Sequence, residues 1–276
     1  MANVLTDAMS EDLQSIAAEM RLRLVQISNR ARTPHLGSAM SCVEILIASY
    51  WNYLGVTPNN VESIDRDRFI LSKGHAASAL YVTLAKRGFF PEEWLNDFGK
   101  PGAALAEQPA PGCAPGVELA TGSLGHGLPV AVGMALAGRI KNIGNRVLAV
   151  LSDGECNEGS VWEAAMLASS QGLSHLSVVV DYNKWQATGR SNEILKLESL
   201  VDKWISFGWQ ACEVDGHSID EVSSALNVER SEKPVAVIAH TVKGKGVSFM
   251  EDDNNWHYRI PTEEEVEKAG KELGVL

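Results

Sequence analysis

Two polar residues about thirty positions apart are the strongest candidates for chemistry in this sequence. Asp153 directly follows the apolar run 147–151, and Asn183 lies just beyond the apolar run 176–180. A strand–helix–strand unit occupies about that length, so both side chains can emerge together at the carboxyl edge of a parallel sheet. One carboxylate, one amide oxygen and a nearby backbone carbonyl suit Mg²⁺ or Ca²⁺ shared with a phosphate group, because Mg²⁺ takes few protein ligands plus phosphate oxygens.

The same two residues also have a purely structural interpretation. Asp153 could cap the helical segment near 155–170, and Asn183 could form a turn. Gly154 and Gly159 would let the backbone approach a phosphate closely, but a turn also uses glycine. The spacing alone leaves both interpretations open.

The elements that must position these residues follow from the apolar pattern. Helical spacing predicts a helix over 12–27 and a second over 41–53, followed by a short strand at 68–71. Strands at 147–151, 176–180 and 235–239 then alternate with helices at 130–140, 161–170 and 219–227. Continuous β-branched runs alternating with helices indicate an α/β fold, with a mostly parallel sheet and helices on both faces. The segment 98–127, rich in Gly, Pro and Ala, is expected to be a long functional loop.

Composition excludes several classes of protein. The chain has 276 residues, is 45% hydrophobic and carries a net charge of −11, which argues against disorder and against a nucleic-acid partner. No apolar run is long enough to span a bilayer, so no membrane partner is expected, and the first residues lack a signal-peptide pattern. The four cysteines are far apart and form no Cys-x-x-Cys pair, which predicts a reduced, cytoplasmic setting.

Five segments, in order along the chain, resemble the transketolase family. They are residues 31–38, Ser72-Lys73-Gly74-His75-Ala76, residues 115–127, the run Ser152-Asp153-Gly154 continuing to Asn183, and residues 241–251 with His257 beyond. The fourth resembles the thiamine-diphosphate motif, Gly-Asp-Gly followed by Asn about thirty residues on. The resemblance covers nearly the whole chain, roughly from Leu13 to Pro261.

The resemblance implies a role for each matched position. Bound Mg²⁺, with Ca²⁺ as a possible substitute, would be held by the side chains of Asp153 and Asn183 and the backbone carbonyl of Trp185. The residues that would contact thiamine diphosphate are His75, Gly122, Ser123, Leu124, Gly154, Glu155 and Asn183. The catalytic histidines, which would face the donor ketose and the reacting carbon, would be His35 and His257. Glu158 and Glu163 match buried acids near the family's subunit interface that are implied to couple two active sites.

Three departures from the family pattern qualify this transfer of roles. Ser152 stands where the motif has its first glycine, and Pro34 and Leu36 flank His35 where glycine and proline are usual. Gln108 stands where the family typically has a substrate-facing histidine. A neutral amide can hydrogen-bond but cannot shuttle a proton, so a shifted substrate range is expected.

The resemblance also implies a missing half. Residues 1–276 correspond to a single diphosphate-binding domain, and the family's pyrimidine-binding and C-terminal domains are absent from this sequence. We expect both on a partner chain, with two copies of each chain in an α2β2 heterotetramer, because family active sites form between paired subunits. The expected function is a transketolase-like transferase that is active only with this partner.

Three functions remain in competition at this stage. The first is transfer of a two-carbon ketol unit from a ketose, as sugar or sugar phosphate, to an aldehyde acceptor. The second uses the same cofactor for decarboxylation of a 2-keto acid followed by acyl or ketol transfer, which Gln108 leaves open. The third is a non-catalytic module that regulates a partner, although the retained Asp153, Asn183 and His75 oppose it. The sequence does not identify the sugars or the metabolic pathway.

Overall fold

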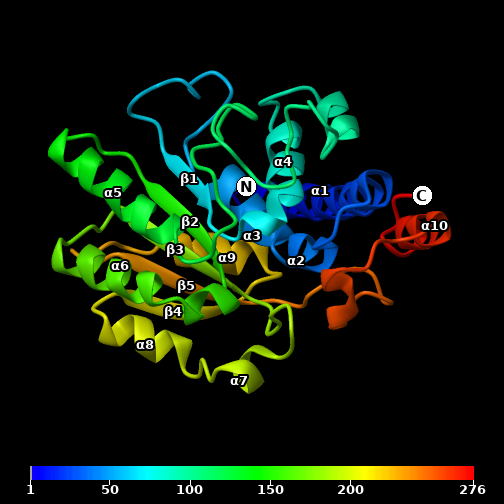
Figure 1. Ribbon diagram of the computed structural model, residues 1–276. Coiled ribbons are helices and arrows are strands. Elements are labelled where there is room, and N and C mark those ends of the chain that lie inside the picture. The colour runs from blue at the N-terminus through cyan, green and yellow to red at the C-terminus, as the bar shows by residue number, and fades with distance from the viewer. Residues whose placement is uncertain (1) are drawn as a thin grey trace.

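A five-stranded, wholly parallel sheet organises the chain (Figure 1). The computed structural model describes residues 2–276, and burial of side chains from residue 13 onward. The strands are β1 (Arg68–Leu71), β2 (Val147–Ser152), β3 (Leu176–Tyr182), β4 (Gln210–Asp215) and β5 (Val235–His240), in the spatial order β1-β2-β3-β5-β4.

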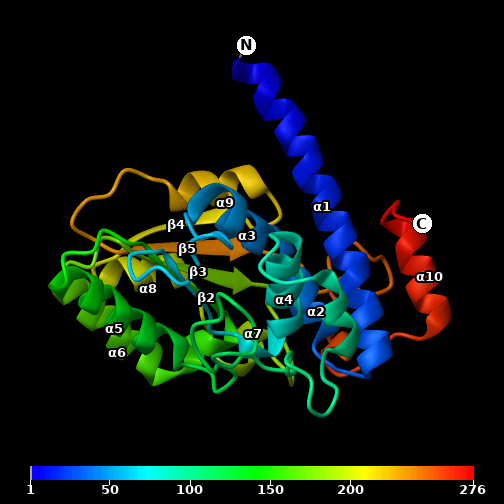
Figure 2. The same ribbon diagram turned by 90° about the horizontal axis from the view of Figure 1, so that it is seen from above.

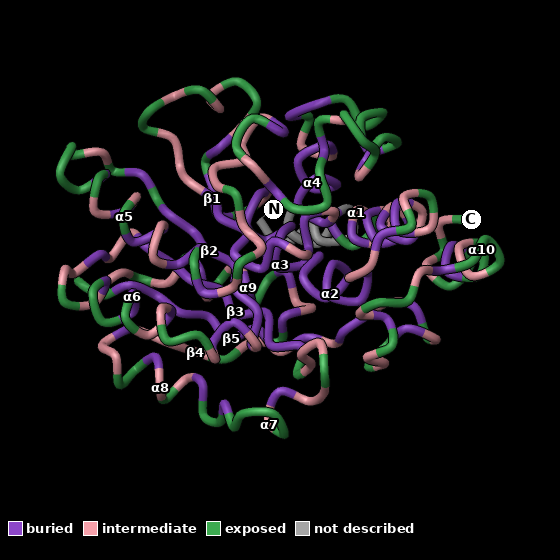
Figure 3. Tube along the Cα trace, viewed as in Figure 1, coloured by how far each residue is buried: buried purple, intermediate pink, exposed green. Residues whose placement is uncertain are grey.

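The register of the central strands brings their carboxyl ends to one level. Ser152 pairs with Asp181 across β2 and β3, and Tyr182 pairs with His240 across β3 and β5. Every residue of β2 and β3 is buried, as Figure 3 shows for the centre of the molecule. β-branched residues covered on both faces are typical of parallel sheets. The residues that follow these strands therefore meet at one edge.

Helices cover both faces of the sheet. One core cluster joins the sheet to α1 (Ala2–Ala31), α2 (Leu36–Ser41), α3 (Val43–Ile47), the π-helical turn η1 (Ala48–Tyr53), α4 (Ala77–Lys86) and α9 (Ile219–Leu226). A second joins the opposite face to α5 (Gly127–Ile140), α6 (Gly159–Ser170) and α8 (Leu200–Ser206). The last helix, α10 (Glu263–Glu272), lies beside α1 (Figure 2).

Shorter helical turns shape the loops. They are the 3₁₀ turns η2 (Gly74–Ala76), η3 (Glu92–Asp97), η4 (Gly154–Asn157) and η5 (Asn254–His257), together with the single turn α7 (Ser191–Ile194). Three of them, η2, η4 and η5, place residues that the sequence singled out. No helix within residues 2–276 combines the length and apolarity needed to cross a membrane.

The fold class and most of the expected elements are confirmed. All four predicted strands form, and residues 98–126 contain neither helix nor strand. The helix expected over 41–53 forms from Val43 to Tyr53, where α3 continues directly into the π-helix η1. It begins two residues later than expected, because the separate helix α2 ends at Ser41. The sequence reasoning did not find α4, α8, β4 or α10.

Candidate active site

A cavity of about 360 Å³ opens at the carboxyl edge of the sheet, beyond β2 and β3. Eight of the eleven predicted site residues line it: His35, His75, Gly122, Leu124, Gly154, Asn183, Trp185 and His257. Gln108 lines it as well. Residues separated by more than 200 positions therefore share one cleft, as expected for a ligand site at the edge of a parallel sheet.

The three remaining predicted residues do not line the cavity. Ser123 is exposed, and Asp153 and Glu155 are fully buried beneath the floor. Glu155 accepts hydrogen bonds from the Ser72 hydroxyl and from the Gly125 amide, the latter at 2.8 Å. Its carboxylate therefore ties the end of β1 to the loop at 122–127, rather than pointing at a ligand.

Asp153 and Asn183 lie next to each other, as their spacing predicted. The Asp153 carboxylate accepts from the Lys184 amide at 2.9 Å and from the Ser191 hydroxyl at 2.7 Å. It also accepts from the Gly154 amide, so it caps η4 as the structural interpretation suggested. Capping and ligand binding are thus compatible here, because a carboxylate has about four acceptor positions.

The donor set suits a hard divalent cation. Asp153 has a carboxylate and Asn183 an amide oxygen, which accepts from the Trp185 amide at 3.0 Å. The third ligand that the sequence predicts is the backbone carbonyl of Trp185. Burial raises the pKa of Asp153 to about 6, against the hydrogen bond from Ser191. A nearby cation would relieve that cost. Among the described residues no trio of His, Cys, Asp or Glu forms a metal cluster, so an oxygen-only set that includes amide and backbone groups is the arrangement available.

Two glycines and two buried polar atoms shape the walls of the cavity. Gly122 has a φ of +133°, and a Cβ there would overlap the side-chain amide of Gln108. A Cβ on Gly154 would lie 3.0 Å from Cγ of Gln186. Two buried side-chain atoms at the cavity, Gln186 Nε2 and Asn157 Oδ1, have no hydrogen-bond partner among the described residues. Unpartnered buried polar groups cost about 1–3 kcal/mol each, so a polar occupant would satisfy them.

Three histidines from distant parts of the chain gather at the same cavity. The ring centroids of His35 and His257 are 4.9 Å apart, and those of His35 and His75 are 5.4 Å apart. The His35 amide donates to the His257 carbonyl at 2.8 Å. His35 has a φ of +70°, unusual for a non-glycine residue and of a kind that clusters at functional sites.

All three histidines are neutral at pH 7. Burial, together with the nearby cation Lys243, lowers the pKa of His257 to about 3 and lowers that of His35. Burial, then Lys73, holds the pKa of His75 well below its usual value. Each ring can therefore donate one hydrogen bond and accept another, but it carries no charge.

Lys243 is a site residue whose role the sequence did not resolve. It is fully buried, and its ammonium donates to Nδ1 of His257 at 3.0 Å and to Asn254 at 2.8 Å. Because Nδ1 accepts, the proton of the neutral ring resides on Nε2. Burial, then repulsion from Lys73, lowers the pKa of Lys243 to about 8. Spacing gave no signal here, since the contact joins a loop to η5.

A buried ion pair beneath the cavity was also missed. The Lys73 ammonium contacts the Asp181 carboxylate, and both side chains are fully buried. Asp181 also accepts from Ser41 at 2.6 Å and from Thr241. Lys73 donates to the Ser38 carbonyl at 2.8 Å. This network joins α2 to the ends of β1, β3 and β5, and so supports the floor on which Asn183 and the histidines rest.

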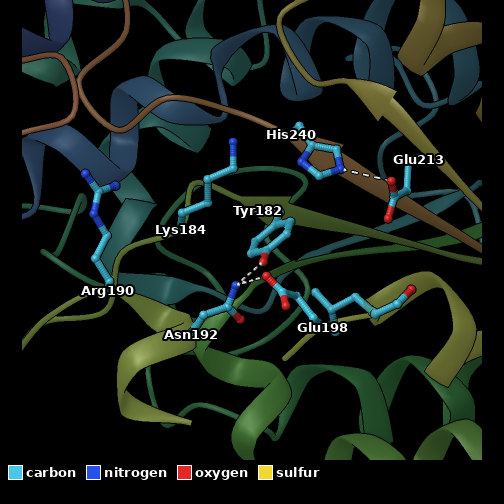
Figure 4. Close-up of a pocket in the computed structure, with 9 residues that line it drawn as sticks. Tyr182, Lys184, Arg190, Asn192, Glu198, Glu213 and His240 are labelled. Carbon is cyan, nitrogen blue, oxygen red and sulfur yellow. Dashed lines mark hydrogen bonds and ion pairs between the residues drawn. The ribbon is translucent and has the colours of Figure 1, made fainter. Parts of the chain in front are cut away.

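A larger hollow of about 580 Å³ lies beside this edge, around Tyr182 and His240 (Figure 4). Its polar groups are largely paired with one another. His240 lies 3.4 Å from Glu213, and Asn192 donates to both Tyr182 and Glu198. None of the predicted site residues lines it, so we assign the chemistry to the smaller cavity.

A parallel α/β sheet with a polar, glycine-lined cavity at its carboxyl edge is an architecture that binds phosphate-bearing ligands. The family described as "Transketolase, thiamine diphosphate binding domain" matches residues 13–276. The chain belongs to this family of transketolase domains.

Relatives of similar length are named as single subunits of transketolases. One is a subunit of the apulose-4-phosphate transketolase of Phocaeicola vulgatus, 40% identical over 268 residues, with 95% of this chain and 94% of that protein covered. The 6-deoxy-6-sulfo-D-fructose transketolase subunit SqwG of a Clostridium species is also 40% identical, with 95% and 96% covered. This chain is thus a transketolase-like subunit, which favours ketol transfer over the competing functions.

Solved structures confirm the fold. The transketolase of Campylobacter jejuni has a TM-score of 0.88 and 27% identity, with 95% of this chain but 42% of that chain covered. A transketolase complex with sedoheptulose-7-phosphate from Pichia stipitis has a TM-score of 0.87 and 26% identity, with 96% and 41% covered. The chain therefore spans about two fifths of the length of these solved transketolases.

Proposed function

We propose that this chain, together with a second subunit, transfers a two-carbon ketol unit from a ketose donor to an aldehyde acceptor, using thiamine diphosphate and Mg²⁺. One observation carries the proposal: three neutral histidines face the same cavity as the glycine cradle and the Asp153–Asn183 pair. A phosphate-metal anchor alone would serve many reactions. Neutral donors beside it suit a polyhydroxylated substrate.

Different residues of this chain would hold the ion, make room for the cofactor and fix the surrounding loop. Asp153, Asn183 and the Trp185 carbonyl would hold the divalent ion, and Gly122 and Gly154 leave room for the cofactor. When bound, thiamine diphosphate supplies the electron sink for breaking the bond beside the ketose carbonyl. The buried floor and the loop at 122–127, tied down by Glu155, keep this geometry fixed.

The histidines would handle the substrate's oxygens. Nε2–H of His257 can donate to a carbonyl or hydroxyl oxygen, because Lys243 occupies Nδ1. His35 and His75 lie within 6.2 Å of it, measured between ring centroids, and offer further neutral donors or acceptors. Neutral rings can pass a proton between oxygens without burying a permanent charge.

A partner chain completes the site in this proposal. The two relatives of similar length are each named as one subunit of a transketolase, and the chain spans about two fifths of the solved transketolases. We infer that the partner carries the pyrimidine-binding and C-terminal domains and that the assembly is α2β2. Glu158 and Glu163 are exposed in the isolated chain, which is consistent with their lying at a subunit contact.

The substrates named for the two relatives narrow the class of ketose that we propose. Their names specify a sugar phosphate and a sulfonated sugar, so a ketose with a terminal anion is the class we propose here. Gln108, an exposed amide at the cavity, stands beside Gly122 and offers both a donor and an acceptor to that substrate.

The test is reconstitution. The chain is purified alone and with a candidate partner, and each preparation is assayed with thiamine diphosphate, Mg²⁺, an aldehyde acceptor and either a ketose or a 2-keto acid. We expect the two-chain complex to turn over the ketose and the chain alone to be inactive. Full activity of this chain alone would contradict the need for a partner, and turnover of keto acids but not ketoses would contradict ketol transfer from sugars.

A further inference from the structure

The residue after His257 is an exposed aromatic side chain beside two histidines that line the cavity. Tyr258 is 64% exposed, one of the few large aromatic or apolar side chains that the described chain leaves open to solvent. Its ring lies edge-on to His257, with centroids 4.7 Å apart, and 6.2 Å from His35. It therefore contacts one substrate-facing histidine of the proposed site and lies near the other.

The loop that carries Tyr258 is firmly anchored. The preceding Trp256 is fully buried and donates to the Phe249 carbonyl at 2.8 Å. The following Arg259 stacks on the Trp256 ring at 4.4 Å and pairs with Glu265. The His257 carbonyl accepts from His35. A rigid loop that holds an aromatic ring in water is preorganised to cover something, because an exposed ring forgoes the free energy of burial.

We propose that Tyr258 is a specificity-determining residue that packs against the carbon chain of the donor ketose beyond its reacting end. This inference rests on the proposed function. Single C–C bonds are about 1.5 Å, so about three carbons span the distance from His257 to the Tyr258 ring. The part of the substrate at Tyr258 is then the distal end of a five- or six-carbon ketose.

The chemistry of the ring fits this segment. An aromatic face carries partial negative charge and a large apolar area. In the C–H bonds of hydroxylated carbons the hydrogen carries a partial positive charge. The side of a sugar chain that presents these hydrogens therefore stacks on an aromatic face. The phenol hydroxyl adds one donor and one acceptor at the rim. A three-carbon donor has only one carbon beyond its carbonyl carbon, so with that carbonyl at His257 it would not reach the ring.

The experiment compares a five- or six-carbon ketose with a three-carbon donor, hydroxypyruvate, in the reconstituted complex. Wild type, Tyr258→Ala, Tyr258→Phe and a control, Trp94→Ala, are assayed for kcat and KM separately. Trp94 is a 41% exposed aromatic that stacks on Phe90, on η3. Tyr258→Ala should raise KM for the ketose by roughly tenfold, because one aromatic contact contributes about a factor of ten to affinity. The KM for hydroxypyruvate should stay within about twofold of the wild-type value.

Each outcome decides the proposal. Retention of most ketose affinity by Tyr258→Phe, with Trp94→Ala unchanged, supports stacking. An equal loss for both donors would mean that Tyr258 acts only through His257, and would overturn the proposal. So would loss of the partner from Tyr258→Ala in native mass spectrometry, which would show that the partner chain covers the ring. A wild-type complex that does not turn over the ketose would overturn the proposed function, and this inference with it.

Discussion

At the scale of single residues, the Gln108 side chain packs against Gly122, in the space that a side chain at position 122 would need. A Cβ on Gly122 would overlap the Gln108 amide, and its φ of +133° disfavours any residue with a side chain. We expect Gly122→Ala to lower affinity for thiamine diphosphate by at least about tenfold, because the loop must move away from the cradle. Tryptophan fluorescence during cofactor titration of the complex measures this, since Trp185 lines the same cavity.

A double variant separates the two causes. Gln108→Ala removes the side chain that a Cβ at position 122 would meet, while the backbone strain remains. Gly122→Ala combined with Gln108→Ala should therefore recover part, but not all, of the lost affinity. If the double variant binds no better than Gly122→Ala, the steric contact with Gln108 is not the cause.

We expect Lys243 to lower the stability of the folded chain while it fixes the tautomer of His257. No carboxylate lies within ion-pair distance of its buried ammonium among residues 13–276, where Asn254 and His257 are its contacts. An unpaired buried charge is costly, so Lys243→Met should unfold at an equal or higher urea concentration at pH 7. Turnover should fall nevertheless, because the Nε2–H form of His257 is no longer enforced. A variant that is both less stable and fully active would contradict this account.

The pH dependence of stability gives a separate test of Lys243. Its pKa is lowered from 10.5 to about 8 in the folded chain. Between these values the unfolded chain binds more protons, so the free energy of unfolding rises with pH, by up to about 3 kcal/mol. Urea denaturation from pH 7 to 10 should show this rise in wild type relative to Lys243→Met. Lys245→Met, which removes a half-buried lysine near Glu251, should behave as wild type.

At the scale of elements, the Lys73–Asp181 pair couples α2 to three strands. Asp181→Asn would leave the fully buried Lys73 without its carboxylate, while Ser41 and Thr241 lose a charged acceptor. Breaking a buried pair from one side typically costs about 3–5 kcal/mol. Urea unfolding should show a loss of that size. The double variant Lys73→Met with Asp181→Asn should regain much of it, and a double variant as unstable as the single one would contradict the coupling.

The elements predictable from sequence were those buried on both faces. β2, β3 and β5 are continuous apolar runs, and each was placed within about two residues. β4 was missed because it is an edge strand whose residues are half-buried or exposed, and its sequence Gln-Ala-Cys-Glu-Val-Asp contains no apolar run. α10 was missed because it is mostly charged, with Ala269 and Gly270 as its buried residues.

The site residues that could be predicted from the sequence are those placed by the end of a strand, rather than by a side-chain contact. Asp153 and Asn183 follow strands directly, so their meeting follows from the sheet alone. The packing of Glu155 under the 122–127 loop depends on which way a buried side chain turns, which no spacing encodes. The contact of Lys243 with His257 depends on the fold of the 241–258 loop, and likewise has no periodic signal.

At the scale of the whole molecule, the cofactor and its ion should act as a stabilising ligand only when the partner closes the site. A ligand at 100 times its Kd stabilises the folded state by about 2.7 kcal/mol, and each kcal/mol raises Tm by roughly 2–4 °C at this chain length. EDTA should therefore lower the Tm of the cofactor-loaded complex by about 5–10 °C, and Mg²⁺ or Ca²⁺ should restore it. The isolated chain should respond far less.

Two variants identify the source of that shift. Asp153→Asn removes the buried carboxylate of the proposed ion site, so the complex should lose most of its response to EDTA. Asp65→Asn alters an exposed carboxylate in the loop before β1 and should respond as wild type. If EDTA leaves the wild-type Tm unchanged while thiamine diphosphate stays bound, the cofactor is held without a divalent ion. Asp153 would then serve only as the cap of η4.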